Sequence, residues 1–165
     1  AHTPQEVILG FSFGLRKNHP GTCNMDLMRF LWQKEEIKKN PLILQEELYQ
    51  AAWLLLGNIV IRLDVIKVFD SSLKHPPTTK DMAQEGVRIA HEKGYKVISV
   101  LAFPFIHRFF CWYFVKKYAK PYNIRVEIIK TGYIPFDQNS DQWLARGPVR
   151  LICYTILRAC GIRWL

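Results

Sequence analysis

Five short apolar runs, rich in Val and Ile, alternate along this 165-residue chain with longer segments of helical spacing. Continuous apolar runs of strand length are typical of parallel strands, which are covered on both faces. The alternation predicts an α/β fold: a Rossmann-like, three-layer αβα sandwich around an open, mainly parallel sheet of about five strands. We expect strands at 6–11, 41–45, 58–63, 95–103 and 124–130, and helices at 24–39, 45–57, 78–94, from the FPF turn to about 120, and 148–165.

Size and composition indicate one globular domain. A chain of 165 residues, 49% of them hydrophobic, has the length and apolar content of a single packed core, so we expect one domain over residues 1–165. A membrane-spanning helix needs about 18 consecutive apolar residues, whereas the two long apolar runs stop at His107 and Lys116. The sequence opens without the pattern of a signal peptide. We expect a cytoplasmic protein, with association at a membrane surface as the alternative.

The cysteines favour a reducing compartment. Cys23, Cys111, Cys153 and Cys160 show no C-x-x-C spacing. The last two lie about two turns apart on one predicted helix, roughly 10 Å, which is too far for a disulfide. We expect four reduced thiols. Because no Asp/His cluster has the spacing of metal ligands either, we expect no metal, and the sequence indicates no particular cofactor.

The chain is basic. Lys and Arg outnumber Asp and Glu by 23 to 14, which gives a net charge of +9. Positive charge favours anionic partners, although it also serves plain solubility. No basic run has the length or aromatic spacing of a nucleic-acid module. The expected partner is therefore an anionic or nucleotide-like small molecule, and not a specific nucleic acid.

The loop after the first expected strand is long for a connection of its kind. In an open α/β sheet, ligands collect where the carboxyl ends of the strands meet the amino ends of the helices. The loop matches neither G-x-G-x-x-G nor a Gly-Lys-Ser/Thr phosphate loop, and a plain surface loop is the alternative. Its glycines allow close backbone approach, and its polar side chains suit an anion. The expected ligand-binding residues at this edge of the sheet are Gly10, Ser12, Arg16, Asn24, Gln45 and Thr79.

A His and an Arg stand side by side in the aromatic stretch LAFPFIHRFFCWYF. Pro104 suits an early helical position, which places His107 and Arg108 in the first helical turn, near the carboxyl end of the preceding strand. There His107 is the candidate catalytic proton donor or acceptor, and Arg108 a candidate anion-binding residue. The alternative is a packed helix whose His and Arg face water. A Ser12-His107-Glu46 triad is disfavoured, because no G-x-S-x-G turn is present.

Several segments, taken in order, resemble the YdcF-like family (the ElyC/SanA/YdcF group), a small αβα domain of poorly defined biochemical function. They are VILGFSFG, TTKDMAQEG, VISVLAFPFIHRF and PFDQNSDQWLARGP. The resemblance covers most of the chain and implies the αβα fold. The family usually separates its His and Arg by two residues, often ends its second strand in Ser-Gly-Gly, and commonly begins a helix with Asn-Thr-x-Glu-Asn. The corresponding positions here hold His107-Arg108, Gln45-Glu46-Glu47 and Thr78-Thr79-Lys80-Asp81-Met82.

The final helix, PVRLICYTILRACGIRWL, is amphipathic. Arg150, Tyr154 and Arg158 follow one another at intervals of four beside apolar residues. Such a helix can lie on an anionic membrane surface, or it can simply pack on the sheet. The expected function is that of a ligand-binding α/β domain of the YdcF-like family, acting on a phosphate-bearing or nucleotide-like small molecule, with turnover left open. The alternative is a non-catalytic binding module associated with the cell envelope.

Overall fold

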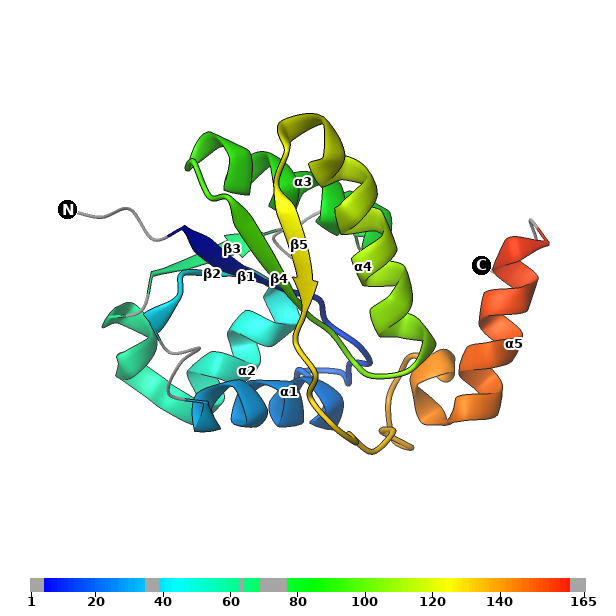
Figure 1. Ribbon diagram of the computed structural model, residues 1–165. Coiled ribbons are helices and arrows are strands. Elements are labelled where there is room, and N and C mark those ends of the chain that lie inside the picture. The colour runs from blue at the N-terminus through cyan, green and yellow to red at the C-terminus, as the bar shows by residue number, and fades with distance from the viewer. Residues whose placement is uncertain (1–4, 35–38, 63, 69–76, 161–165) are drawn as a thin grey trace.

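Strands and helices alternate along the chain as the sequence predicts. Figure 1 shows the computed structural model, which describes residues 5–34, 39–62, 64–68 and 77–160. The elements are β1 (Glu6–Gly10), α1 (Thr22–Gln33), β2 (Leu42–Gln45), α2 (Glu46–Leu56), η2 (Gly57–Arg62), β3 (Val65–Val68), α3 (Thr79–Glu92), β4 (Val97–Leu101), α4 (Ile106–Ala119), η3 (Lys120–Tyr122), β5 (Arg125–Ile128), η4 (Trp143–Arg146) and α5 (Pro148–Ala159).

The five strands form one open, parallel sheet with the order β3-β2-β1-β4-β5. β1 is central, and Gly10 near its end pairs with Leu44 of β2 and with Leu101 of β4. The chain builds outward from β1 to β3 and then returns to β4 on the other side of β1. The carboxyl ends of β1 and β4 are therefore the topological switch point, where ligands bind in sheets of this kind.

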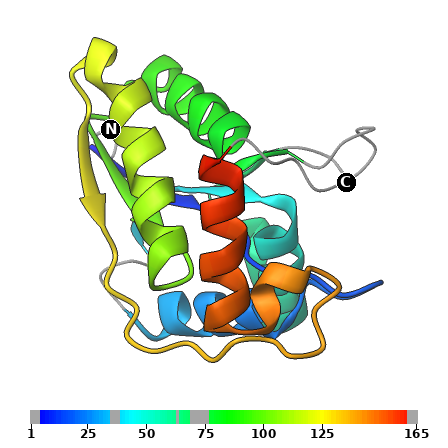
Figure 2. The same cartoon turned by 90° about the vertical axis from the view of Figure 1, so that its right-hand side faces the viewer.

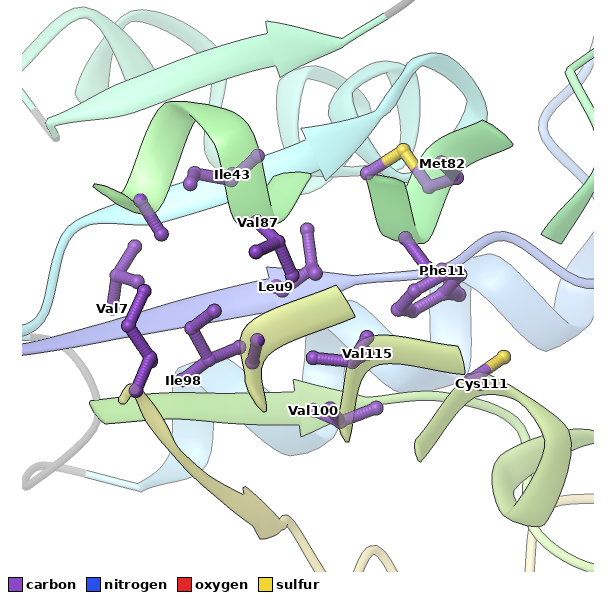
Figure 3. Packing of buried hydrophobic residues seen from close by; sticks show 14 of the residues in the cluster. Val7, Leu9, Phe11, Ile43, Met82, Val87, Ile98, Val100, Cys111 and Val115 are labelled. Carbon is purple, nitrogen blue, oxygen red and sulfur yellow. The ribbon is translucent and has the colours of Figure 1, made fainter. Parts of the chain in front are cut away.

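Helices cover both faces of the sheet, which confirms the three-layer αβα sandwich. α1 and α2 lie on one face, and α3 and α4 on the other (Figure 1). Alternate residues of β1 enter the two cores: Leu9 packs with residues of α3 and α4, whereas Ile8 packs with residues of α1 and α2. Figure 3 shows Leu9 close to Val87 of α3 on the first of these faces. A strand buried on both sides is expected to be apolar, and β1 is apolar from Val7 to Leu9, with Glu6 at its partly exposed start.

The start of α3 is a capping box formed by Thr78 and Asp81. The backbone N–H of Asp81 donates to Thr78 Oγ1 at 3.2 Å, and the backbone N–H of Thr78 donates to Asp81 Oδ2 at 3.0 Å. These bonds satisfy amide groups that have no partner within the helix, and they fix where α3 leaves the edge of the sheet.

The predicted third strand at 58–63 is wrong. Residues Gly57–Arg62 form the turn η2, and the strand β3 follows at Val65–Val68, where Val65 pairs with Leu42 of β2. Val60 is buried in the core beneath α1 and α2. An apolar run of this length suits a buried helical turn as well as a strand, and the residue pattern does not separate the two.

The helix starts and ends also differ from the predictions. Pro104 does not lie in the first turn of α4, because Phe105 takes a left-handed backbone conformation (φ +66°) and the helix begins only at Ile106. The first long helix ends at Gln33. Parts of two predicted helices, residues 35–38 and 161–165, lie outside the described residues.

α5 is not part of the three layers. It packs mainly against η4 and stands to the right of the layers in Figure 1; in Figure 2, which is viewed from that side, it lies in front of them. The expectation that this helix packs on the sheet is therefore wrong. Within the described part of the chain, no helix has the length and apolar content to cross a membrane.

Candidate functional site

The loop between β1 and α1 is folded around the buried side chain of Asn24. Asn24 Oδ1 accepts a hydrogen bond from the backbone N–H of Phe13 at 2.8 Å. Its Nδ2 donates to the backbone carbonyls of Gly14, at 2.7 Å, and of Pro20. The turn at Gly14 has φ +70°, where a side chain would be strained. The oxygen and the nitrogen of the Asn24 amide are therefore both used in hydrogen bonds that hold the loop.

Asp137, from the chain after β5, fastens the same loop from outside. Its carboxylate accepts from Arg16 Nε at 2.9 Å and from Arg16 Nη2 at 2.6 Å. It also accepts from the backbone N–H groups of Thr22, at 3.2 Å, and Asn139, at 3.1 Å. Burial raises the pKa of Asp137, but the bonds from Arg16 and the two amides outweigh it, and the net pKa lies below the ordinary value. The carboxylate is therefore ionised at neutral pH.

Further contacts join the loop to residues 137–142, which we call the latch segment. Ser140 Oγ donates to the carbonyl of Leu15 at 3.0 Å, and Gln142 Oε1 accepts from the backbone N–H of Gly14 at 3.0 Å. The backbone N–H of Asp141 also donates to Leu15, at 2.7 Å. The chain before α5 thus fixes the shape of the loop after β1.

An aromatic cluster fills the space between the loop and the start of α4. The rings of Phe13 and Phe103 stack with centroids 4.2 Å apart, and Phe136 meets Phe103 at 4.9 Å. The imidazole of His107 lies 4.7 Å from the ring of Phe13. Phe105 stacks on Phe136 at 5.9 Å, with its outer side exposed. The switch point is therefore closed on this side by rings.

His107 is a neutral side chain in this environment. Burial lowers its pKa to about 4. Its Nε2 lies 3.6 Å from Cys111 Sγ, and burial raises the pKa of that thiol well above its ordinary value. Because the thiolate and the imidazolium are both disfavoured, the contact is not an activated Cys-His pair.

Replacing His107 by glutamine is expected to flatten the dependence of stability on pH between 6.5 and 4. The unfolded chain takes up a proton on this His near its ordinary pKa of 6.5, and the folded chain only near 4. The wild-type protein therefore has its full stability above pH 6.5 and loses about 3 kcal/mol as the pH falls to 4. Urea unfolding at several pH values measures the loss. The exposed His91, replaced in the same way, should leave the wild-type profile; an equal profile in both variants would contradict the assignment.

The helices that begin at this edge of the sheet differ in the acidic residues and side-chain caps at their first turns. At α1 the carboxylate of Asp137 accepts from Thr22, α2 carries Glu46 and Glu47 in its first turn, and α3 has its capping box. The first turn of α4 has no acidic residue and no side-chain cap. Its free N–H groups and partial positive charge stay available for an anion.

Arg108 lies in that uncapped first turn. Its Nη1 is buried and has no hydrogen-bond partner within the described residues. Arg108 precedes the buried residues Cys111 and Val115 by three and seven positions, which places it on the side of α4 that faces the core. One more side-chain atom, Glu47 Oε2 at the start of α2, is buried and unpartnered.

Most of the predicted residues lie near the switch point, and several of them form hydrogen bonds or packing contacts within the protein. Gln45 Oε1 accepts from the backbone N–H of Ser12 at 3.1 Å. A side chain at Gly10 would meet the side chains of Leu44 and Leu48, so this glycine lets α2 approach. Thr79, the first residue of α3, has no hydrogen bond to the loop among the residues described.

Two functional features were missed by the sequence reasoning. The latch segment was not connected with the first loop, although PFDQNSDQWLARGP was noted as a segment of its own. Phe13 was not among the predicted site residues, although its ring lies against the imidazole of His107.

Comparison of the chain with protein-family models, with curated proteins and with solved structures found no match. Among the residues that the structure describes, no group of three or more His, Cys, Asp or Glu side chains is placed to hold a metal ion.

Proposed function

We propose that the protein binds a phosphate-bearing small molecule, with nucleotides as one class, at the start of α4. The observation that carries the proposal is the Arg108 Nη1 atom, buried without a partner in a first helical turn that has neither acid nor cap. The net charge of +9 and the resemblance to the YdcF-like family support it.

The proposed ligand would supply what Arg108 lacks. A buried guanidinium nitrogen without an acceptor has given up its hydrogen bond to water. An anion at the start of α4 would restore that bond and would also accept from the free backbone N–H groups of the first turn. The partly exposed Ser12, on the neighbouring loop, adds a hydroxyl at the same switch point.

The chemistry we propose at this site is transfer or hydrolysis at the phosphate. A bound anion next to His107 favours the protonated imidazole, and so raises its pKa from about 4. A protonated His107 could donate to a leaving oxygen. The ligand would thus create the proton donor that the free protein lacks, whereas a ligand that leaves His107 neutral would be bound without turnover.

Replacing Arg108 by methionine is expected to weaken binding of pyrophosphate or a nucleotide ten- to a hundredfold. The estimate follows from the loss of about 1.5–3 kcal/mol that hydrogen bonds to charged groups contribute. Thermal unfolding with increasing ligand measures it, because a ligand of the native state raises the melting temperature. The free variant should be as stable as the wild type or more so, since an unpaired buried charge has been removed.

Lys117→Met is the matched control, because it removes the same charge from the exposed far end of α4. It should retain wild-type binding. Equal affinity in Arg108→Met and the wild type, or no response to any phosphate compound, would refute the proposal.

The alternative function is a non-catalytic module at the cell envelope. It is favoured by α5, which packs mainly against η4 outside the three layers. We infer the cytoplasmic side of such a membrane, because the free and exposed Cys153 and Cys160 suit a reducing compartment. If phosphate compounds have no effect on melting while binding to vesicles is retained, this alternative replaces the enzyme-like one.

A further inference from the structure

The apolar side of α5 faces solvent. Val149, Ile152 and Ile156 are 70%, 47% and 56% exposed, at spacings of three and four residues that line them up along one side of the helix. Cys153 and Cys160 are exposed on the same side. Among the described residues of α5, Leu151 is the one that enters the hydrophobic core, with an exposed fraction of 4%. A helix of a globular protein normally turns its apolar stripe inward.

The position of α5 leaves this stripe uncovered. The helix is held by η4 at its beginning and stands to the side of the layers (Figure 1). The exposed fractions of Val149, Ile152 and Ile156 show that no other described element covers the stripe. The exposed stripe therefore requires an occupant from outside the described part of the chain.

The charge beside the stripe favours an anionic occupant. Between Trp143 and Cys160, the last described residue, the sequence holds no acidic residue, and Arg146 and Arg150 are both exposed. Arg150 is exposed and places its guanidinium 5.7 Å from the ring centroid of Trp143, which is itself 48% exposed. A second copy of the chain would bring arginines against arginines. An apolar stripe with Arg150 and an exposed tryptophan beside it fits the interface of an anionic bilayer.

We propose that α5 lies in the plane of an anionic membrane surface, with Val149, Ile152 and Ile156 among the acyl chains and Arg150 at the headgroups. The helix is too short to span the bilayer, so this is a peripheral contact. It is independent of the anion site at α4, and it gives the envelope association a defined surface.

The test is co-sedimentation with vesicles of phosphatidylcholine, with and without phosphatidylserine. The wild-type protein should bind the mixed vesicles and release them as salt is raised. Ile152→Ser with Ile156→Ser should weaken binding at least about tenfold through lost apolar insertion. Arg150→Gln should weaken it roughly fivefold at low salt, at about 1 kcal/mol for a charge near the surface.

The matched control is Leu54→Ser with Ile59→Ser, which changes two apolar side chains that are 61% and 47% exposed on α2 and η2. It should bind as the wild type does, and so should Arg108→Met, which separates this proposal from the anion site. Equal loss in both serine pairs, or no preference for phosphatidylserine, would overturn the proposal. A wild-type dimer that becomes monomeric in Ile152→Ser with Ile156→Ser would overturn it as well, because a second copy would then cover the stripe.

Discussion

Replacing Asp137 by alanine is expected to lower the free energy of unfolding by about 3–5 kcal/mol, the usual result of removing one partner of a buried ion pair. The carboxylate is 1% exposed and holds four donors, two of them on Arg16 and two on backbone amides. Arg16 can turn to water, but the amides of Thr22 and Asn139 lose their acceptor. Urea unfolding at neutral pH measures the loss.

Asp141→Asn is the control, because it removes a neighbouring, exposed carboxylate from the same latch segment. It should change the free energy of unfolding by less than about 0.5 kcal/mol. The folded-state pKa of Asp137 is depressed, so its contribution is complete above the ordinary carboxyl pKa of about 3.9 and is lost as the pH falls through the folded pKa. The difference between wild type and Asp137→Ala should therefore shrink in acid. A loss as small as that of Asp141→Asn would contradict the latch.

The order of the elements could be predicted because apolar residues are spaced differently in strands and in helices, and the sequence shows both spacings in alternation. β1 and β4 are mainly apolar because both of their faces are covered, and their two polar residues, Glu6 and Ser99, are hydrogen-bonded to each other. Thr78 with Asp81 is a local signal that the structure retains. The position of β3 could not be predicted, because an apolar residue such as Val60 can be buried in a helical turn as well as in a strand. Its structure depends on what packs around it.

The edge of the sheet where the candidate residues lie could be predicted, but their contacts could not. The switch-point rule names the carboxyl edge of the strands, since it depends only on the alternation of strands and helices. It could not show that Arg16 would be taken by Asp137, because 121 residues separate them and no local pattern joins them. Nor could it show that Phe105 would adopt a left-handed backbone, which bulky residues rarely do.

Arg108, at the uncapped start of α4, is the predicted basic residue that is not used in these internal contacts. Asn24, Gln45 and Arg16 were predicted to bind a ligand because their side chains form hydrogen bonds. The same property lets them bind the loop itself. Arg108 differs because its Nη1 is buried and still has no acceptor among the described residues.

Replacing Asn24 by alanine is expected to lower the free energy of unfolding by about 3–4 kcal/mol. The side chain is fully buried, and its loss leaves the N–H of Phe13 and the carbonyls of Gly14 and Pro20 without their partner. Each buried polar group so abandoned costs about 1–3 kcal/mol, less where water can enter. Urea unfolding gives the value, and faster amide exchange in the β1–α1 loop should accompany it.

Gln33→Ala controls for the loss of an amide from α1, because that side chain is exposed at the end of the helix, and it should be within about 0.5 kcal/mol of the wild type. Asn24→Asp keeps the size of the side chain but points a carboxylate at two carbonyl oxygens. In the folded protein this disfavours the ionised form, so the folded-state pKa of the new carboxyl lies above its unfolded value. Its stability should therefore rise as the solution is acidified through that pKa, when the protonated acid can again donate. A loss in Asn24→Asp that does not depend on pH, or a loss in Asn24→Ala no larger than in Gln33→Ala, would mean that the loop is held by the latch segment alone.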